Sequence, residues 1–277
     1  MDIDLEAHLR ALLGPYRVIA DHTWPEWREA LVLELADAEG VRWFLKRHRR
    51  AEGYRAELRA YQRWVPVLGP HAPRLGDADD PSQSLVISAV AGRRPEQWVS
   101  PQLQHDAGAL LRRFHDAEDL GPWEDMVAAK TARLEFWAAR GGGLVDRQLV
   151  GAVRARLKAL EGIGPVRCVP SHRDYSPRNW LVSDGQLHVI DFGDAGPDVW
   201  VHDFGRLLLS WRLPPQARAA FFDGYGRTPT EEDMAVLRAS YAADLVFGIV
   251  WTHEHTNAKL EASLRELLVG LLADDLV

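Results

Sequence analysis

The chain has 277 residues, of which 47% are hydrophobic and 26% charged, a composition typical of a globular protein. Its net charge of −7 gives no electrostatic reason to bind nucleic acid or an anionic membrane, although an acidic surface can attract a cationic small molecule. The single cysteine, Cys168, cannot form an intramolecular disulfide, and no apolar run approaches the ~20 residues needed to span a bilayer, so we expect a cytoplasmic protein.

The N-terminal part of the chain contains a helix pattern followed by strand patterns. Residues 1–18 have amphipathic spacing and lack the basic start and apolar block of a signal peptide. Residues 29–46, EALVLELADAEGVRWFLK, hold two apolar runs around a turn signal at residues 37–40. This pattern predicts a β-hairpin whose second strand ends at Lys46.

The next two segments complete the predicted N-terminal part. Residues 51–65, AEGYRAELRAYQRWV, place Tyr54, Leu58 and Tyr61 on one face of a helix. Residues 84–92, SLVISAVAG, are a short apolar strand ending in glycine. Beyond this point helical patterns predominate. We therefore expect a small β-rich lobe over residues 1–90, a larger helical lobe over residues 91–277, and a ligand site between them.

The stretch SHRDYSPRNWLVSDGQLHVIDFGDAG, which begins at Ser171, interrupts the helical part. Its Asp184-Gly185 pair is typical of a type I′ turn, which would pair Ser183 with Gln186 and bring Asn179 opposite Ile190.

That register brings Asn179 and Asp191 together at the open end of the hairpin. Two side-chain oxygens there, one of them anionic, suit a hard divalent ion that takes its other ligands from phosphates and water. We interpret the pair as a Mg²⁺ site. Asp174 precedes it in a loop and is the candidate base, or orienting group, for an attacking hydroxyl.

The order H-R-D-x-x-x-x-N followed by D-F-G resembles the catalytic and metal-binding loops of the protein-kinase-like superfamily. A second D-F-G occurs at Asp203, but it leads into an apolar helical run. We therefore expect Asp203 to anchor a loop or begin a helix instead of binding metal.

The length of the segment after Gly193 distinguishes protein kinases from small-molecule kinases. Only DAGPDVWVH precedes the next helical run, so a peptide-binding activation segment ending near A-P-E has no room. The pattern resembles the aminoglycoside phosphotransferase and choline kinase family, whose members phosphorylate hydroxyls of small molecules. The resemblance implies an α+β, two-lobed protein-kinase-like fold and an enzyme that uses ATP or GTP with Mg²⁺.

Carried over by position, the resemblance implies a catalytic role for Asp174, metal binding by Asn179 and Asp191, and phosphate binding by Lys46. Lys46 also opens the basic run KRHRR, which could be an ordinary solvated turn. The family pairs this lysine with a helix glutamate. Glu57 flanks the apolar helix face, so we prefer it to Glu52.

The resemblance also points to residues around the base of the nucleotide. Ser88 and Val90, at the end of the apolar strand, are candidate adenine contacts. Leu181 and Ile190 could form an apolar floor under the base, although residues of this type would be buried in any case. Segment 20–30, where a glycine-rich phosphate loop is expected, reads ADHTWPEWREA and contains no glycine.

The acceptor is less well defined by the sequence. Acids and aromatics of the helical lobe would suit an amine-bearing acceptor through charge and cation–π contacts, and our candidates are Asp194, Asp198, Trp251 and Glu254. We expect a cationic antibiotic such as an aminoglycoside, which would make the protein a resistance enzyme. Choline-like alcohols, amino acids and sugars remain alternatives, as does a nucleotide-binding pseudokinase. The oligomeric state is left open.

Overall fold

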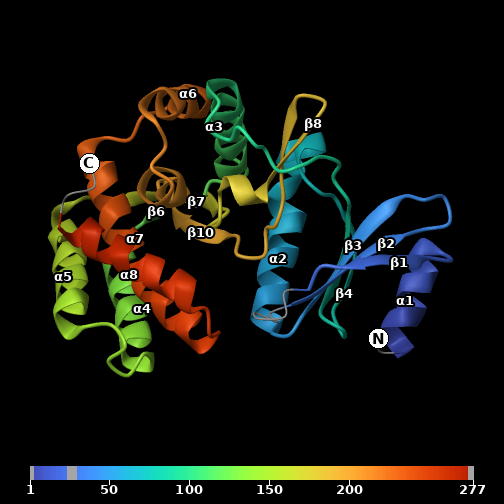
Figure 1. The fold of residues 1–277 in the computed structure, drawn as a ribbon, viewed down its shortest axis with the longest axis horizontal. Coiled ribbons are helices and arrows are strands. Elements are labelled where there is room, and N and C mark those ends of the chain that lie inside the picture. The colour runs from blue at the N-terminus through green and yellow to red at the C-terminus, as the bar shows by residue number, and fades with distance from the viewer. Residues whose placement is uncertain (1–2, 24–29, 274–277) are drawn as a thin grey trace.

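The computed structural model describes residues 3–23 and 30–273. Its N-terminal part is an antiparallel sheet with one helix on each face (Figure 1). The helices are α1 (Ile3–Leu13) and α2 (Ala51–Arg63), and the strands are β1 (Arg17–Asp21), β2 (Ala30–Ala36), β3 (Arg42–His48), β4 (Leu75–Asp79) and β5 (Ser84–Ser88). The sheet order is β1-β2-β3-β5-β4.

Successive side chains along each strand point to opposite faces of this sheet, so neighbouring residues have different contacts. Leu45 points to one side, where it packs with Leu35 and with Leu5 and Leu9 of α1. Lys46, the next residue, therefore points to the other side, toward α2. The predicted hairpin is confirmed, with Val32 opposite Lys46, and the predicted helix over residues 51–65 is α2.

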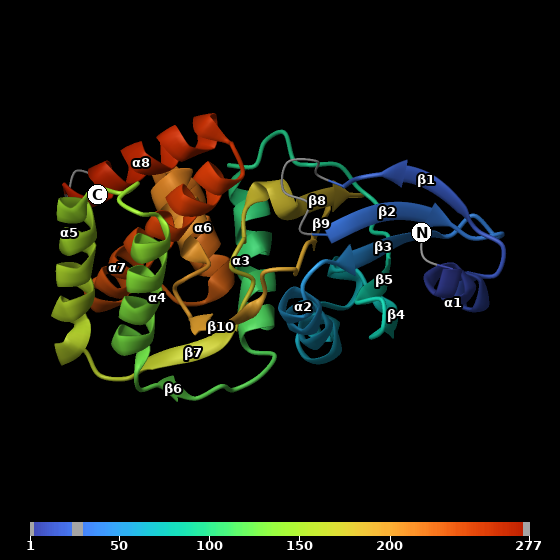
Figure 2. The ribbon, with the colours of Figure 1, turned by 90° about the horizontal axis from the view of Figure 1, so that it is seen from below.

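The C-terminal part is mainly helical and lies beside the face of the sheet that carries α2 (Figures 1 and 2). Its helices are α3 (Pro101–His115), α4 (Met126–Arg140), α5 (Arg147–Lys158), α6 (Pro215–Tyr225), α7 (Glu231–Glu254) and α8 (Ala258–Leu272). Its strands are β6 (Pro122–Trp123), β7 (Val166–Ser171), β8 (Trp180–Ser183), β9 (Gln186–Val189) and β10 (Gly196–Val199).

These strands form two small sheets that carry the motif loops. β7 pairs with β6 and β10, and β8 pairs with β9. One apolar cluster runs from Tyr61 of α2 through Phe192 to the centre of the helical part, where Phe204 and Val246 are fully buried. Because this core is continuous, the N-terminal sheet and the C-terminal helices hold each other in place.

Close helix packing in the C-terminal part depends on small residues. Gly108 of α3 faces the backbone of Phe221, and Gly224 of α6 faces the backbone of His105, each so closely that a Cβ atom would collide with it. α3, which also contacts the motif-bearing strand β7, is thereby fixed against α6.

Helix α7 is long and apolar enough to cross a membrane by length and composition, and it is the one such helix in the part of the chain that the structure describes. However, 61% of its apolar window is buried inside the protein, as expected for a core helix of a globular fold.

The segment that follows β5 joins the two parts of the chain and contacts the motif hairpin. β5 ends at Ser88, four residues before Gly92, where the apolar pattern stops. Arg93 and Val182 exchange backbone hydrogen bonds of 3.1 and 2.8 Å. Gly92 has a φ of +132°, and a Cβ atom there would lie 2.9 Å from the carbonyl oxygen of Val182. Only glycine fits this position without strain.

We therefore expect Gly92→Ala to lower the free energy of unfolding by about 1–3 kcal/mol, because it combines a disfavoured φ with a backbone clash. Urea denaturation measures this change. The matched control is Gly151→Ala in α5, where nothing lies within 4 Å and the substitution should be neutral or stabilising by about 0.5–1 kcal/mol. Equal stability of wild type and Gly92→Ala would contradict the proposed constraint.

Candidate active site

Lys46 forms a charged contact between the N-terminal and C-terminal parts of the chain. Its ammonium lies 2.6 Å from Glu57 Oε1 on α2 and 3.0 Å from Asp191 Oδ1, which is 145 residues further along the chain. Glu57 is fully buried, and the Lys46 side chain is only 11% exposed. The structure thus pairs Lys46 with Glu57, which the sequence favoured over Glu52.

The charges in this cluster stabilise one another. Burial alone would lower the pKa of Lys46, but Asp191 and Glu57 together raise it well above its usual value. Burial would raise the pKa of Glu57, but Lys46 and His48, whose Nε2 lies 2.9 Å from Oε2, keep it low. Lys46 also lowers the pKa of Asp191 to about 2. All three groups are therefore ionised at neutral pH.

The hairpin β8–β9 has the register that the sequence predicts. Ser183 pairs with Gln186 and Val182 with Leu187, and the turn residues Asp184 and Gly185 have φ values of +51° and +74°, as a type I′ turn requires.

At the open end of this hairpin, the Ile190 N–H donates to the carbonyl of Asn179 at 3.0 Å. The register places Asn179 beside Asp191, whose φ is +66°. A non-glycine residue in this region costs about 1–3 kcal/mol and is most often found at functional sites.

Asp174 is held by three side chains. Arg178 donates to both of its carboxylate oxygens at 2.6–3.1 Å, and the Nε atom of Arg206 lies 2.5 Å from Oδ1. The amide of Asn179 donates to Oδ2 at 2.9 Å and to the Asp174 carbonyl at 3.0 Å. The candidate catalytic and metal residues are therefore in direct contact.

The second D-F-G motif anchors the loop that carries Asp174. The Asp203 carboxylate is buried and accepts hydrogen bonds from the backbone N–H groups of His172 at 2.8 Å and Arg173 at 2.6 Å. His115 Nε2 lies 3.0 Å from Oδ2. Burial would raise the pKa of Asp203, but His115 and the neighbouring histidines lower it to about 2. Asp203 is thus the loop anchor that the sequence predicts.

Arg173 occupies a conformation that favours glycine, with a φ of +63°. Its guanidinium lies over Gly196, donates to the Pro197 carbonyl at 2.5 Å and lies 3.4 Å from Asp198. The arginine thus makes contacts between the loop and β10 (Gly196–Val199) that a glycine could not make.

The four candidate acceptor residues have different surroundings. Asp194 is accessible to solvent in a crowded position, and desolvation by the surrounding atoms, together with the charges of Asp174 and Asp191, raises its pKa. Asp198 is buried and lies 2.8 Å from Lys130 Nζ, so its carboxylate already has a cationic partner. At the end of α7, Glu254 binds Arg140 through two hydrogen bonds of 2.7 and 3.0 Å.

Trp251, the fourth candidate, stacks on His255 at 4.2 Å. Of the three acids among these candidates, Asp194 is the one whose pKa is affected by Asp174 and Asp191.

The candidate base-contacting residues lie where the N-terminal part joins the hairpin. The Ser88 N–H and hydroxyl are both engaged with the Arg74 backbone, at 2.8 and 2.9 Å. Val90, Leu181 and Ile190 are half-buried apolar side chains. The proposed phosphate-covering segment, residues 21–29, lies mostly outside the described residues; within its described part, Thr23 N–H donates to Asp21 at 2.8 Å.

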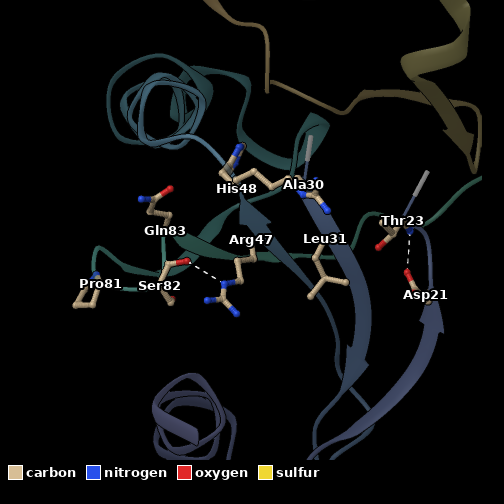
Figure 3. A pocket seen from close by; sticks show the side chains of 10 residues that line it. Asp21, Thr23, Ala30, Leu31, Arg47, His48, Pro81, Ser82 and Gln83 are labelled. Atoms are coloured by element: carbon tan, nitrogen blue, oxygen red, sulfur yellow. Dashed lines mark hydrogen bonds between the residues drawn. The ribbon is translucent and has the colours of Figure 1, made fainter. Parts of the chain in front are cut away.

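A hollow of about 880 Å³ lies at one end of the N-terminal sheet (Figure 3), and its lining residue His48 also contacts Glu57. Arg47 and His48 line it from opposite faces of β3, and Arg47 donates to the Ser82 carbonyl at 3.3 Å. Asp174 and Asp191 are not among its lining residues. We therefore place the candidate active site at the carboxylate cluster and not in this hollow.

The sequence interpretation missed two residues of the cluster, Arg178 and Arg206. Arg178 follows Asp174 by only four residues, so an ion pair between these opposite charges could have been proposed from the sequence. Arg206 is brought to Asp174 only by the fold, and nothing in its sequence neighbourhood indicates the contact.

A family model described as the phosphotransferase enzyme family (APH) matches residues 27–239, more than half of the chain. The chain belongs to this phosphotransferase family. Membership confirms the resemblance found in the sequence and the prediction of a small-molecule kinase. No curated protein sequence matches the chain.

Several solved structures have a similar fold over almost the whole length of this phosphotransferase. The gentamicin complex of APH(2")-IIa is 15% identical, with a TM-score of 0.68 and coverage of 97% of this chain and 96% of that one. Macrolide 2'-phosphotransferase MphH from Brachybacterium faecium is 19% identical, with a TM-score of 0.64 and 99% coverage of both chains.

A third similar structure is amicoumacin kinase hAmiN in complex with AMP-PNP, Ca²⁺ and Ami. It is 17% identical, with a TM-score of 0.67 and coverage of 99% of this chain and 94% of that one. These likenesses confirm the expected α+β, two-lobed protein-kinase-like fold.

The anchoring role of Asp203 gives a pH-dependent prediction. Its folded pKa of about 2 lies below the value of ~3.9 for an unfolded chain, so its ionised form stabilises the fold above about pH 4, and this contribution is lost as the pH falls toward 2. We expect Asp203→Asn to lower the free energy of unfolding by roughly 3 kcal/mol at pH 7 and by less at pH 3.

Urea denaturation of both proteins across this pH range measures the difference. The control is Asp106→Asn, an exposed acid on α3, which should change the free energy of unfolding by less than about 0.5 kcal/mol at either pH. A penalty for Asp203→Asn that stays constant between pH 7 and pH 3 would argue against an ionised anchor.

Proposed function

We propose that the protein is a cytoplasmic kinase that transfers the γ-phosphoryl group of ATP or GTP to a hydroxyl of a cationic small molecule, with an aminoglycoside or another amine-bearing antibiotic as the acceptor class. Residues 1–90 would form the nucleotide-binding lobe and residues 91–277 the catalytic and acceptor-binding lobe. The observation that carries the proposal is the meeting of Lys46 and Asp191, 3.0 Å apart, beside the Asp174–Asn179 contact.

The side chains at the hairpin end fit a magnesium ion. Asp191 is ionised at neutral pH, and Asn179 beside it offers an amide oxygen. Within residues 3–23 and 30–273, no group of three or more His, Cys, Asp or Glu side chains is arranged to hold a metal. Mg²⁺ commonly uses one or two protein ligands and takes the rest from water and phosphates. A bound ion would neutralise phosphate charge.

The chain's own residues then have distinct tasks. Lys46, held in place by buried Glu57, would bind the α and β phosphates. Asp174 would orient the acceptor hydroxyl and take its proton. The hydroxyl oxygen forms a bond to the γ-phosphorus while the bond from that phosphorus to the β,γ-bridging oxygen breaks, and its electron pair leaves with the nucleoside diphosphate.

The proposed acceptor class follows from charge and from similar proteins. The pKa of Asp194 is raised by burial and by two neighbouring carboxylates, an arrangement that a cationic ligand would relieve. The similar structures include complexes with gentamicin and with Ami. Asp198 is buried and pairs with Lys130, so it is not retained among the acceptor contacts. Glu254, whose pair with Arg140 is accessible to solvent, and Trp251 are retained as contacts near the end of α7.

A panel of acceptors tests this proposal directly. The protein is incubated with Mg²⁺, either ATP or GTP, and aminoglycosides, macrolides, peptide antibiotics, choline or amino alcohols, and products are identified by mass spectrometry. We expect one amine-bearing compound to gain a phosphoryl group, and Asp174→Ala to lower kcat by about 10²–10⁴-fold.

The control for this panel is Asp106→Ala, which removes an exposed acid of α3 and should retain wild-type turnover. Phosphorylation of neutral alcohols alone would overturn the proposed acceptor class. Nucleotide binding without any product across the panel would favour a binding protein over a kinase.

A further inference from the structure

The Asp174 carboxylate is fully engaged in this structure. A carboxylate offers about four lone-pair sites, and here Arg178, Arg206 and Asn179 make five contacts with its two oxygens. A hydroxyl that must donate its proton to Asp174 finds no free site. At least one guanidinium must therefore leave the carboxylate before an acceptor can react there.

The charges of both arginines also act on the other carboxylates of the cluster. The pKa of Asp191 is lowered mainly by Lys46, and the charge of Arg178 contributes. The pKa of Asp194 is raised by burial and by carboxylates, an effect that the charge of Arg206 opposes. Their side chains are 38% and 36% exposed, so both guanidiniums can exchange partners without being extracted from the core.

Local backbone structure directs each arginine to this place. Arg178 lies in a single 3₁₀ turn, Pro177–Asn179, between the candidate base and the candidate metal ligand. Arg206 begins a short π-helix, Arg206–Ser210, three residues after the anchor Asp203. The Tyr241 hydroxyl lies 2.5 Å from Ser210 Oγ and helps to hold this π-helix, a rare element that is frequent at functional sites.

Phosphoryl transfer requires positive charge around the three equatorial oxygens of the transferred group. Many kinases cover these phosphates with a glycine-rich loop, but residues 20–30 contain no glycine. Lys46 contacts Glu57 and Asp191 in this structure, and in the proposed function it binds the α and β phosphates and not the γ phosphate. Arg178 and Arg206 are the arginines that the described residues place on Asp174, beside which the γ-phosphoryl group would lie in the proposed function.

We infer that Arg178 and Arg206 bind the transferred phosphoryl group, and that in doing so they release Asp174 to accept the hydroxyl proton. Without nucleotide they neutralise Asp174. When nucleotide binds, the two guanidiniums leave the Asp174 oxygens and bind the oxygens of the γ-phosphoryl group. A planar guanidinium can donate two hydrogen bonds to such a group. This inference rests on the proposed kinase function.

The test compares binding of two probes by calorimetry: ADP with Mg²⁺, and ADP with Mg²⁺ and aluminium fluoride, which mimics the phosphoryl group in transfer. We expect the wild type to bind the second probe at least 10-fold more tightly. We call the gain in affinity from the first probe to the second the increment. Arg178→Gln and Arg206→Gln should each lose most of it, about 10-fold or more, while their affinity for ADP alone stays within about threefold of the wild-type value.

Arg154→Gln is the matched control, because Arg154 forms a comparable exposed ion pair with Glu135 at 2.6 Å on another face of the helical part. It should keep the full increment. Arg178→Lys keeps the charge without the planar fork, and it should recover only part of the increment.

Three outcomes can be told apart. Retention of the increment, within twofold, in both glutamine variants that melt like the wild type would overturn the inference and leave the arginines as structural partners of Asp174. If thermal melting shows that a glutamine variant is unfolded, the lysine variant and its retained charge decide the question by the same comparison. A wild type that binds neither probe would overturn the proposed nucleotide function itself, and this inference with it.

Discussion

The Lys46 ammonium, between Glu57 and Asp191, is the interaction on which the site depends. It joins a strand and a helix of the N-terminal part to a loop of the C-terminal part. Glu57 is fully buried and Lys46 is only 11% exposed, whereas the Asp191 side chain is 55% exposed. Loss of the Lys46 ammonium would therefore leave the buried Glu57 carboxylate desolvated without its ammonium partner. The same constraint that orders the junction therefore leaves an ionised Asp191 and an ordered ammonium, the two charges that the proposed metal and nucleotide site would use.

The catalytic loop is ordered by a second, independent device. Asp203 accepts hydrogen bonds from two backbone N–H groups at the start of the loop, and its carboxylate also contacts the imidazole of His115 on α3. Asp191 and Arg173 hold positive φ values that cost free energy, and the surrounding core and hydrogen bonds maintain them. The strained residues are thus supported from the helical part, while the Asp191 carboxylate faces Lys46 at the junction.

Much of this arrangement could be predicted because it depends on short-range patterns. The Asp184-Gly185 turn determines the hairpin register, which brings Asn179 next to Asp191, and the helix face of Tyr54 distinguishes Glu57 from Glu52. Contacts set by the tertiary fold could not be predicted in this way. The approach of Arg206 to Asp174 depends on a π-helix, and the burial of Asp198 against Lys130 depends on how α4 packs on β10.

A crystal structure with Mg²⁺ and a non-hydrolysable ATP analogue tests the central claim most directly. The account predicts that the metal binds Asn179 and Asp191, and that Lys46 exchanges its contact with Asp191 for the α and β phosphates while keeping Glu57. A nucleotide bound away from this junction, or phosphates that leave the Lys46–Asp191 contact of 3.0 Å intact, would contradict the account.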